Sequence, residues 1–333
     1  MFNEFTKDFT FTTISLGTSK DTIEEQRNRF KNSRVFGVGV VSHPQLSDIC
    51  NLGIVNNYGV SKIEHSIIRQ AFKVPPIQKG SIVATQKHPS LADVGAMAIL
   101  AMRSADSQRL LNLTDEFNQR VDMIAEAINA ELRALRSKWK PQTLPSKENP
   151  WPKSRQISWN RELVAIDKLV HDRKVSLEDK VAVVLEWLVT GKEPTGYREK
   201  AEHRRGDLIK ALENGDIKHR VIADDKIAIV ESTGWDFARK VGESLAPVVV
   251  YFNPECVSDT EDFTPIRKFQ ITQCYASVIN DKDLIDLATI LVTLSCEELN
   301  WEMSDFEITS PRGVSSNLTV DKVVEIVAKN IIS

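Results

Sequence analysis

The stretch GSIVATQKHPSLADVGAMAILAMRSA, residues 80–105, contains a strand, a turn and a helix in succession. Its first residues form a short apolar run with β-branched side chains, and its last part is a run of small and apolar residues that favour a helix. An earlier stretch, RVFGVGVVSHPQLSD at 34–48, also leads from an apolar run into His-Pro-x-Leu-x-Asp. Strands that enter a turn and then a helix are typical of a parallel sheet with crossover helices.

The rest of the sequence extends this α/β pattern and interrupts it with a long helical region. At 333 residues, the chain is longer than one hydrophobic core usually supports. The pattern predicts an N-terminal arm over 1–33, an α/β domain carrying both motifs over 34–105, a helical connecting region over 106–215 and a C-terminal α/β domain over 216–333. We therefore expect an α/β protein with two α/β domains, whose sheets are parallel or mixed and which are joined by a helical connection.

Hydrophobic periodicity and turn residues also predict the individual elements. Strands are expected at 9–16, 34–42, 51–57, 80–86, 226–232, 247–255 and 267–276. Helices are expected at 21–30, 61–72 with Ser61 as N-cap, 92–105, 110–139, 177–191, 196–216, 237–245, 283–295 and 320–332.

Composition restricts the class of partner. Lys and Arg number 43 against 46 Asp and Glu, a net charge of −3, which argues against a protein that coats long nucleic acids or an anionic membrane. No run approaches the roughly 18 apolar residues of a membrane span, and the N-terminus lacks an apolar signal core. The four cysteines are scattered, without ligand spacing, as in the reduced thiols of a cytoplasmic protein.

The two His-Pro-x-Leu-x-Asp stretches place chemistry-bearing residues after neighbouring strands. Loops at the carboxyl ends of parallel strands carry the ligand sites of α/β sheets. His43, Asp48, His88 and Asp93 are therefore expected in one cleft, where imidazoles and carboxylates would bind a metal or move protons. A structural interpretation stays open beside this one, in which His-Pro ends the strand, Leu fills the core and Asp caps the following helix.

The stretch SIVATQKHPSLADVGAMAILAMRS resembles the first motif of the DHH phosphoesterase superfamily. In that family a strand enters a His-x-Asn-Pro-Asp-x-Asp-Ala-x-Gly loop, and here Pro89 and Gly95 match it. Other positions depart from the motif: Gln86 stands for the His, His88 for the Asn, Ser90 and Ala92 for the metal-binding aspartates, and Asp93 for the Ala. Asn56 and Asn57, in IVNNYG, faintly resemble the Asp-His-His stretch but precede the first motif.

The C-terminal third is similar to the substrate-binding domain of the same superfamily. The resemblance lies in APVVVYFNPE, RKFQITQC and FEITSPRGVSSNLTVDKVVEIV. An arginine, a glycine and two hydroxyls just ahead of the closing helix also favour an anion site on their own chemistry, and these are Arg312, Gly313, Ser315 and Ser316. An ordinary Ser- and Asn-rich loop is the alternative.

The resemblance implies a hydrolase for a small phosphate-bearing substrate, a phosphoester or short oligonucleotide, held in an interdomain cleft. Because Ser90 and Ala92 stand at the metal-binding positions of the motif, Mn²⁺ or Mg²⁺ would need ligands from His43, Asp48, His88 and Asp93, and a metal-free site is the alternative. The residues expected at the substrate are Asn56, Asn57, Arg312, Gly313, Ser315 and Ser316. No membrane or long nucleic acid is expected as a partner, and a homodimer is compatible with the sequence. A catalytically degenerate ligand-binding or regulatory protein, and a non-phosphate reaction on the same scaffold, stay open.

The segment 133–161 has two interpretations. It interleaves basic residues with Trp139, Trp151 and Trp159. Such a pattern is found in grooves for single-stranded nucleic acid, where bases stack on aromatic rings. Tryptophans flanked by prolines also pin a long connection to the surface of a domain.

Overall fold

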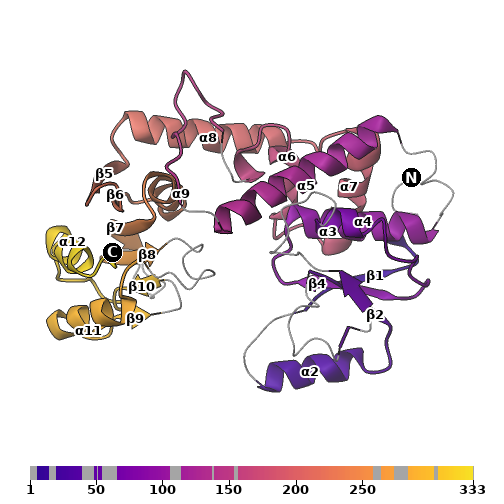
Figure 1. Ribbon diagram of the computed structural model, residues 1–333, viewed down its shortest axis with the longest axis horizontal. Coiled ribbons are helices and arrows are strands. Elements are labelled where there is room, and N and C mark those ends of the chain that lie inside the picture. The colour runs from indigo at the N-terminus through magenta and orange to yellow at the C-terminus, as the bar shows by residue number, and fades with distance from the viewer. Residues whose placement is uncertain are drawn as a thin grey trace. The chain divides into compact units, whose positions relative to one another are not determined.

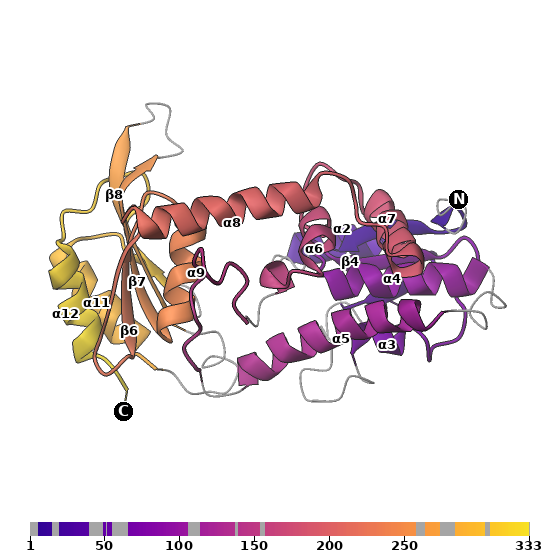
Figure 2. The ribbon, with the colours of Figure 1, turned by 90° about the horizontal axis from the view of Figure 1, so that it is seen from above.

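The computed structural model divides the chain into two compact units (Figures 1 and 2). Unit 1 comprises 1–132 and 155–202, and unit 2 comprises 133–154 and 203–333. The structure describes residues 6–14, 20–39, 49–50, 52–54, 66–105, 114–136, 139–153, 157–257, 264–273, 284–303 and 307–332. Within these ranges no helix is both long and apolar enough to cross a membrane.

Unit 1 is built on a parallel sheet of short strands. Its order is β1-β4-β2-β3, and every neighbouring pair is parallel. The strands are β1 (Thr10–Ile14), β2 (Val35–Val38), β3 (Leu52–Ile54) and β4 (Ile82–Gln86). The two strands that lead into the His-Pro-x-Leu-x-Asp stretches, β2 and β4, are adjacent, with Val38 opposite Thr85. The predicted parallel α/β sheet is thereby confirmed.

Helices cover both faces of this sheet (Figure 1). One face carries α2 (Lys20–Phe30), and the other carries α3 (Ile67–Gln70) and α4 (Leu91–Ala105). Nearly every residue of α4 is buried, which explains its small and apolar composition. Unit 1 also contains α5 (Asp115–Arg136), which extends past its boundary, the 3₁₀ helix η4 (Ile157–Trp159), α6 (Val164–Val170) and α7 (Leu177–Thr190).

Unit 2 contains a mixed sheet between two helical layers (Figure 2). Its order is β5-β6-β7-β8-β10-β9, in which only the β6–β7 pair is parallel. The strands are β5 (Lys218–Ile222), β6 (Ile227–Glu231), β7 (Val248–Val257), β8 (Pro265–Gln273), β9 (Glu302–Met303) and β10 (Glu307–Thr309). The helix α9 (Trp235–Leu245) covers one face, and α11 (Leu287–Glu297) and α12 (Val320–Lys329) cover the other. The boundary between the units falls within α8 (Tyr197–Glu213).

Side chains of β7 alternate between the two faces of this sheet. Val250 and Phe252 join the core cluster that includes residues of α11 and α12. Val249 and Tyr251 point to the opposite face, where they meet Gly242 of α9. A Cβ at Gly242 would lie 2.4 Å from Val249 Cγ1, so glycine is what allows α9 to lie close to the sheet.

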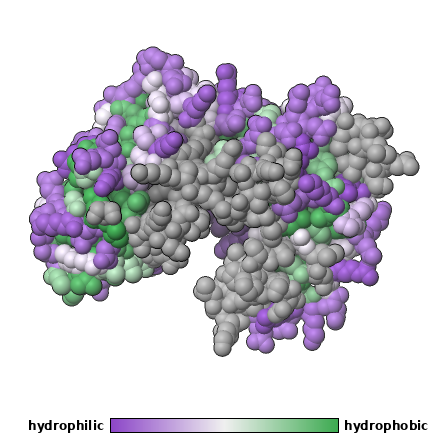
Figure 3. All heavy atoms as spheres, viewed as in Figure 1, coloured by the Kyte–Doolittle hydropathy of each residue, from purple (hydrophilic) through white to green (hydrophobic). Residues whose placement is uncertain are grey.

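Some apolar side chains of unit 2 stay at the surface. Figure 3 shows apolar residues over the region of α11 and α12. Val292 of α11 is 63% exposed, and Ile332, after α12, is 49% exposed. Scattered exposed apolar residues are normal on monomeric proteins, so the homodimer stays a prediction.

The division of the chain differs from the expected domains in two respects. The strand of the expected N-terminal arm, β1, pairs with β4 inside the first sheet. Helices of the expected connecting region belong largely to unit 1, because the apolar face of α7, including Val184 and Leu188, is buried against α4. The helix expected at 61–72 begins only after its N-cap Ser66, and Ser61 lies outside the described residues.

Candidate functional site

Asp93 and Ser90 form a reciprocal cap at the start of α4. The amide of Asp93 donates to Ser90 Oγ at 3.2 Å, and the amide of Ser90 donates to Asp93 Oδ2 at 2.8 Å. The Ser90 hydroxyl also donates to Oδ2 at 2.8 Å. This arrangement is a capping box, in which two unpaired helical amides are satisfied by side chains. The capping interpretation of Asp93 is therefore partly correct, although Ser90 is the residue that directly precedes the helix.

The two carboxylate oxygens of Asp93 differ in their surroundings. Oδ2 accepts a third hydrogen bond, from Gln86 Nε2 at 3.1 Å. Oδ1 is buried and has no hydrogen-bond partner among the described residues. Burial raises the pKa of Asp93, while the hydrogen bonds from Ser90 and Gln86 act in the opposite direction. Asp93 therefore keeps its proton to a higher pH than an exposed carboxyl does.

The end of the neighbouring strand β2 lies directly against Asp93. Gly39 follows this strand with a φ of +75°, and a Cβ built there would lie 2.7 Å from Asp93 Oδ1. Thr85, near the end of β4, also has a buried hydroxyl without a partner among the described residues. Unsatisfied buried polar atoms are rare in proteins, and here two of them lie near the carboxyl end of β4.

The predicted residues of the first α/β region fall partly outside the described structure. His88 is exposed on the loop between β4 and α4, and Asp93 is fully buried at the start of α4. Four of these residues lie outside the described part of the chain, namely His43, Asp48, Asn56 and Asn57. Gly39, which precedes the first His-Pro-x-Leu-x-Asp stretch, does lie against Asp93. The convergence of all four His and Asp side chains stays a prediction.

In unit 2, Arg312 and Gly313 lie on an exposed loop between β10 and α12. Arg312 Nε pairs with Glu302 Oε2 of β9 at 3.0 Å, and its side chain is 84% exposed. Gly313 adopts a φ of +68°, a left-handed conformation that glycine adopts without strain. A phosphate at Arg312 would have to compete with the carboxylate of Glu302.

The two serines of this loop are hydrogen-bonded within unit 2. Ser315 Oγ accepts from the amide of Arg267 at 3.0 Å. The Ser316 hydroxyl donates to Glu298 Oε2 at 2.7 Å, and the amide of Asn317 donates to Glu298 Oε1 at 2.8 Å. The loop therefore does hold an anion, namely the carboxylate of Glu298. Binding of a substrate by these serines stays a prediction.

The described residues do not by themselves make a metal centre. Among them, no group of three or more His, Cys, Asp or Glu is placed to hold a metal ion. At the carboxyl end of β4 they supply one carboxylate, and only one of its oxygens lacks a partner. Two divalent ions need several such ligands, so this set does not fit them. Mn²⁺ or Mg²⁺ bound with His43 and Asp48 stays a prediction.

The three tryptophans of segment 133–161 are in contact with the protein. Trp139 Nε1 donates to the carbonyl of Glu243 at 3.1 Å. The guanidinium of Arg205 lies over the ring of Trp151, and Trp159 is only 7% exposed. These contacts favour tryptophans that hold the connection in place over rings available to stack bases.

Sequence reasoning missed Ser90 and Gly39. The Ser-x-x-Asp spacing of Ser90 and Asp93 is a signature of a capping box, so this contact had a local signal. No local signal marks Gly39, because its role depends on the parallel pairing of β2 with β4.

The chain matches no known protein-family model, and no curated protein is significantly similar to it.

Proposed function

We propose that this protein is a hydrolase for a small phosphate-bearing substrate, a phosphoester or a short oligonucleotide. The observation that carries the proposal is the buried carboxyl of Asp93, whose Oδ1 has no partner among the described residues. It lies where β4 enters α4, against the end of the adjacent parallel strand. This is the edge at which parallel α/β sheets bind their ligands.

The side chains here suit acid–base chemistry on a phosphoester. A water molecule attacks phosphorus, a new P–O bond forms, and the bond to the leaving oxygen breaks. The exposed imidazole of His88 accepts the proton of the attacking water. The leaving oxygen takes the proton of the half-buried Ser90 hydroxyl, and Ser90 Oγ takes a proton from Asp93. For this relay Asp93 is protonated on Oδ2 and donates to Ser90 Oγ, the reverse of the hydrogen bond that the Ser90 hydroxyl makes to the carboxylate. The raised pKa of Asp93 keeps that proton available.

The test compares two aspartates with the same capping role. In α7, Asp179 donates its amide to Ser176 Oγ at 3.1 Å and accepts from that hydroxyl at 2.7 Å, as Asp93 does with Ser90. Release of nitrophenol from bis(p-nitrophenyl) phosphate, and cleavage of a dinucleotide, are measured with added Mn²⁺, added Mg²⁺ and a chelator. Asp93→Asn should lower turnover about 100-fold or more, the usual size of an acid–base contribution.

Asp179→Asn is the matched control and should keep full turnover. If both variants hydrolyse these substrates as fast as the natural chain, Asp93 has no part in the reaction. If the natural chain hydrolyses neither substrate under any of these metal conditions, the proposal fails for phosphoesters as a class.

A second candidate is a ligand-binding or regulatory protein that has lost catalysis. Two hydroxyls that a substrate would use are already hydrogen-bonded within the protein. Ser90 donates to Asp93 and Ser316 donates to Glu298, which favours this candidate. For such a protein, calorimetry with the same dinucleotide should show binding that survives the chelator, with no product on chromatography. Product formation in that mixture would decide for the hydrolase.

A further inference from the structure

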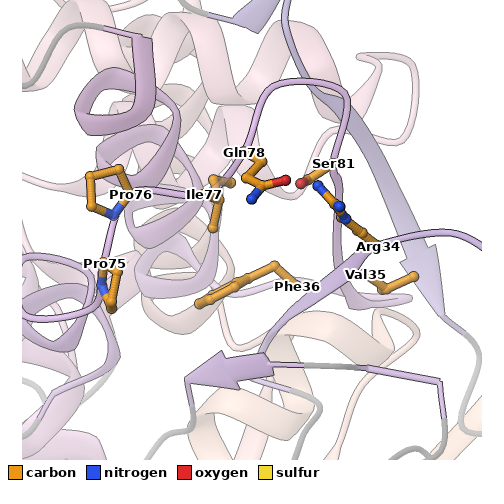
Figure 4. A pocket seen from close by; sticks show the side chains of 8 residues that line it. All are labelled: Arg34, Val35, Phe36, Pro75, Pro76, Ile77, Gln78 and Ser81. Carbon is orange, nitrogen blue, oxygen red and sulfur yellow. The ribbon is translucent and has the colours of Figure 1, made fainter.

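A pocket of about 490 Å³ opens at the end of the first sheet that is opposite to Asp93 (Figure 4). It lies where β2 and β4 begin, and the proposed hydrolase chemistry does not use it. Its lining consists of Arg34, Val35, Phe36, Pro75, Pro76, Ile77, Gln78 and Ser81. This volume is within the range of roughly 300–1,000 Å³ found for small-molecule sites.

One wall of the pocket is held in place by the end of α4. The guanidinium of Arg103 donates through Nη1 to the carbonyl of Ala71 at 2.7 Å and to that of Val74 at 2.5 Å. The amide of Ile77 donates to Ser104 Oγ at 2.9 Å. The prolines between these anchors are therefore fixed before any ligand arrives, which lowers the entropy cost of binding.

The pocket has an apolar side and a polar end. Figure 4 shows Phe36 facing Pro75 and Ile77, while Arg34 extends toward Ser81 and Gln78. The sheet register explains the polar end, because Val35 lies opposite the first residue of β4 and so brings Arg34 beside Ser81.

The polar end offers donors that no described residue engages. In the described part of the chain, no carboxylate pairs with the exposed guanidinium of Arg34. The backbone carbonyl of Arg34 accepts a hydrogen bond from the amide of Ile82. Ser81, at 5% exposure, adds a hydroxyl at the same end. A guanidinium with a neighbouring hydroxyl suits a carboxylate, whose two oxygens match the fork of an arginine.

From this combination we propose that the pocket is a binding site for a small aromatic carboxylate. The ring of the ligand lies against Phe36 and the two prolines, and its carboxylate pairs with Arg34 and the Ser81 hydroxyl. The site is separate from Asp93, so the test of this proposal does not depend on the proposed hydrolysis.

Calorimetric titration with benzoate and with benzamide tests this site. The two probes share size and shape, and only benzoate carries a charge. Benzoate should bind saturably, with a Kd on the order of 1 mM, as expected for a ligand of about nine heavy atoms. Benzamide should bind at least about 10-fold more weakly, the effect of one lost charged pair.

Two variants locate the charge that matters. Arg34→Gln should reduce benzoate affinity to that of benzamide, and it should fold normally because the Arg34 side chain is exposed. Lys31→Gln removes an exposed positive charge that does not line the pocket, and it should leave both affinities unchanged. The proposal is overturned by any of three results: no saturable binding at tens of millimolar benzoate, equal affinity for both probes, or an equal loss in Lys31→Gln.

Discussion

Two carboxyl groups of unit 1, the buried Asp93 and the half-buried Glu131, show how single residues respond to removal from water. Burial is the largest cause of the raised pKa in both. For Glu131, on α5, the pKa rises from 4.5 to about 7, although the amide of Ile157 donates to its Oε1 at 2.8 Å. The carboxylate of Asp167 raises this pKa further, and His171 lowers it.

Glu131→Gln should remove a pH dependence from the stability of unit 1. A carboxyl with a raised folded-state pKa contributes stability that is complete below its unfolded pKa and is lost as pH rises to the folded one. The natural chain should therefore lose stability relative to the variant between pH 4.5 and about 7. The loss should reach at most about 3 kcal/mol and then stay constant. Urea unfolding at several pH values measures it.

The control for this change is Glu126→Gln. Glu126 is exposed on the same helix, so its variant should follow the natural chain at every pH. A difference between natural chain and Glu131→Gln that does not vary with pH would show that burial has no effect on the titration of this carboxyl.

At the scale of elements, the helices α8 and α9 each contain a glycine that serves a different purpose. Among the described residues, Gly206 of α8 has no heavy atom within 4 Å of where a Cβ would lie. Gly242 of α9 faces Val249 at 2.4 Å and Tyr251 Cε1 at 3.0 Å. Only the second glycine is required by packing; the first weakens its helix without a compensating contact.

Substitution by alanine should therefore change stability in opposite directions at these two sites. Gly206→Ala should raise the free energy of unfolding by about 0.5–1 kcal/mol, because alanine restricts the unfolded chain and meets nothing in the folded one. Gly242→Ala should lower it by about 1–3 kcal/mol, because α9 must move away from β7. Urea unfolding followed by circular dichroism measures both, and two changes of the same sign would contradict this account of α9.

At the scale of the whole molecule, each unit has its own sheet and its own buried core. Ile99 of α4 is fully buried in unit 1, and Ile271 of β8 is fully buried in unit 2. No pairing among the described strands joins one sheet to the other. Units with separate cores are expected to unfold separately.

Calorimetry should accordingly show two unfolding transitions. Ile99→Ala should lower the midpoint of one and Ile271→Ala that of the other, each at a cost of about 2–5 kcal/mol for a large-to-small change in a core. A single transition that both variants shift equally would mean that the two units unfold as one.

The amino-acid sequence by itself determined the type and place of most described elements. Most described elements overlap segments predicted from hydrophobic period and caps, with ends that differ by a few residues: the strands β2, β4, β6, β7 and β8 and the helices α2, α4, α5, α7, α8, α9, α11 and α12. Thr319 caps α12, and Asp321 lies in its first turn. Such signals are readable because backbone hydrogen bonds, capping and amphipathic faces depend on residues a few positions apart.

Tertiary structure decided which elements share a core and which side chains are engaged in contacts within the protein. It paired β1 with β4, buried α7 against α4, set Gly39 against Asp93 and placed Glu298 on Ser316. These contacts join residues that are distant along the chain, and no local pattern encodes them. A periodic pattern shows that a face must be buried, but only the packing of the complete unit determines what buries it.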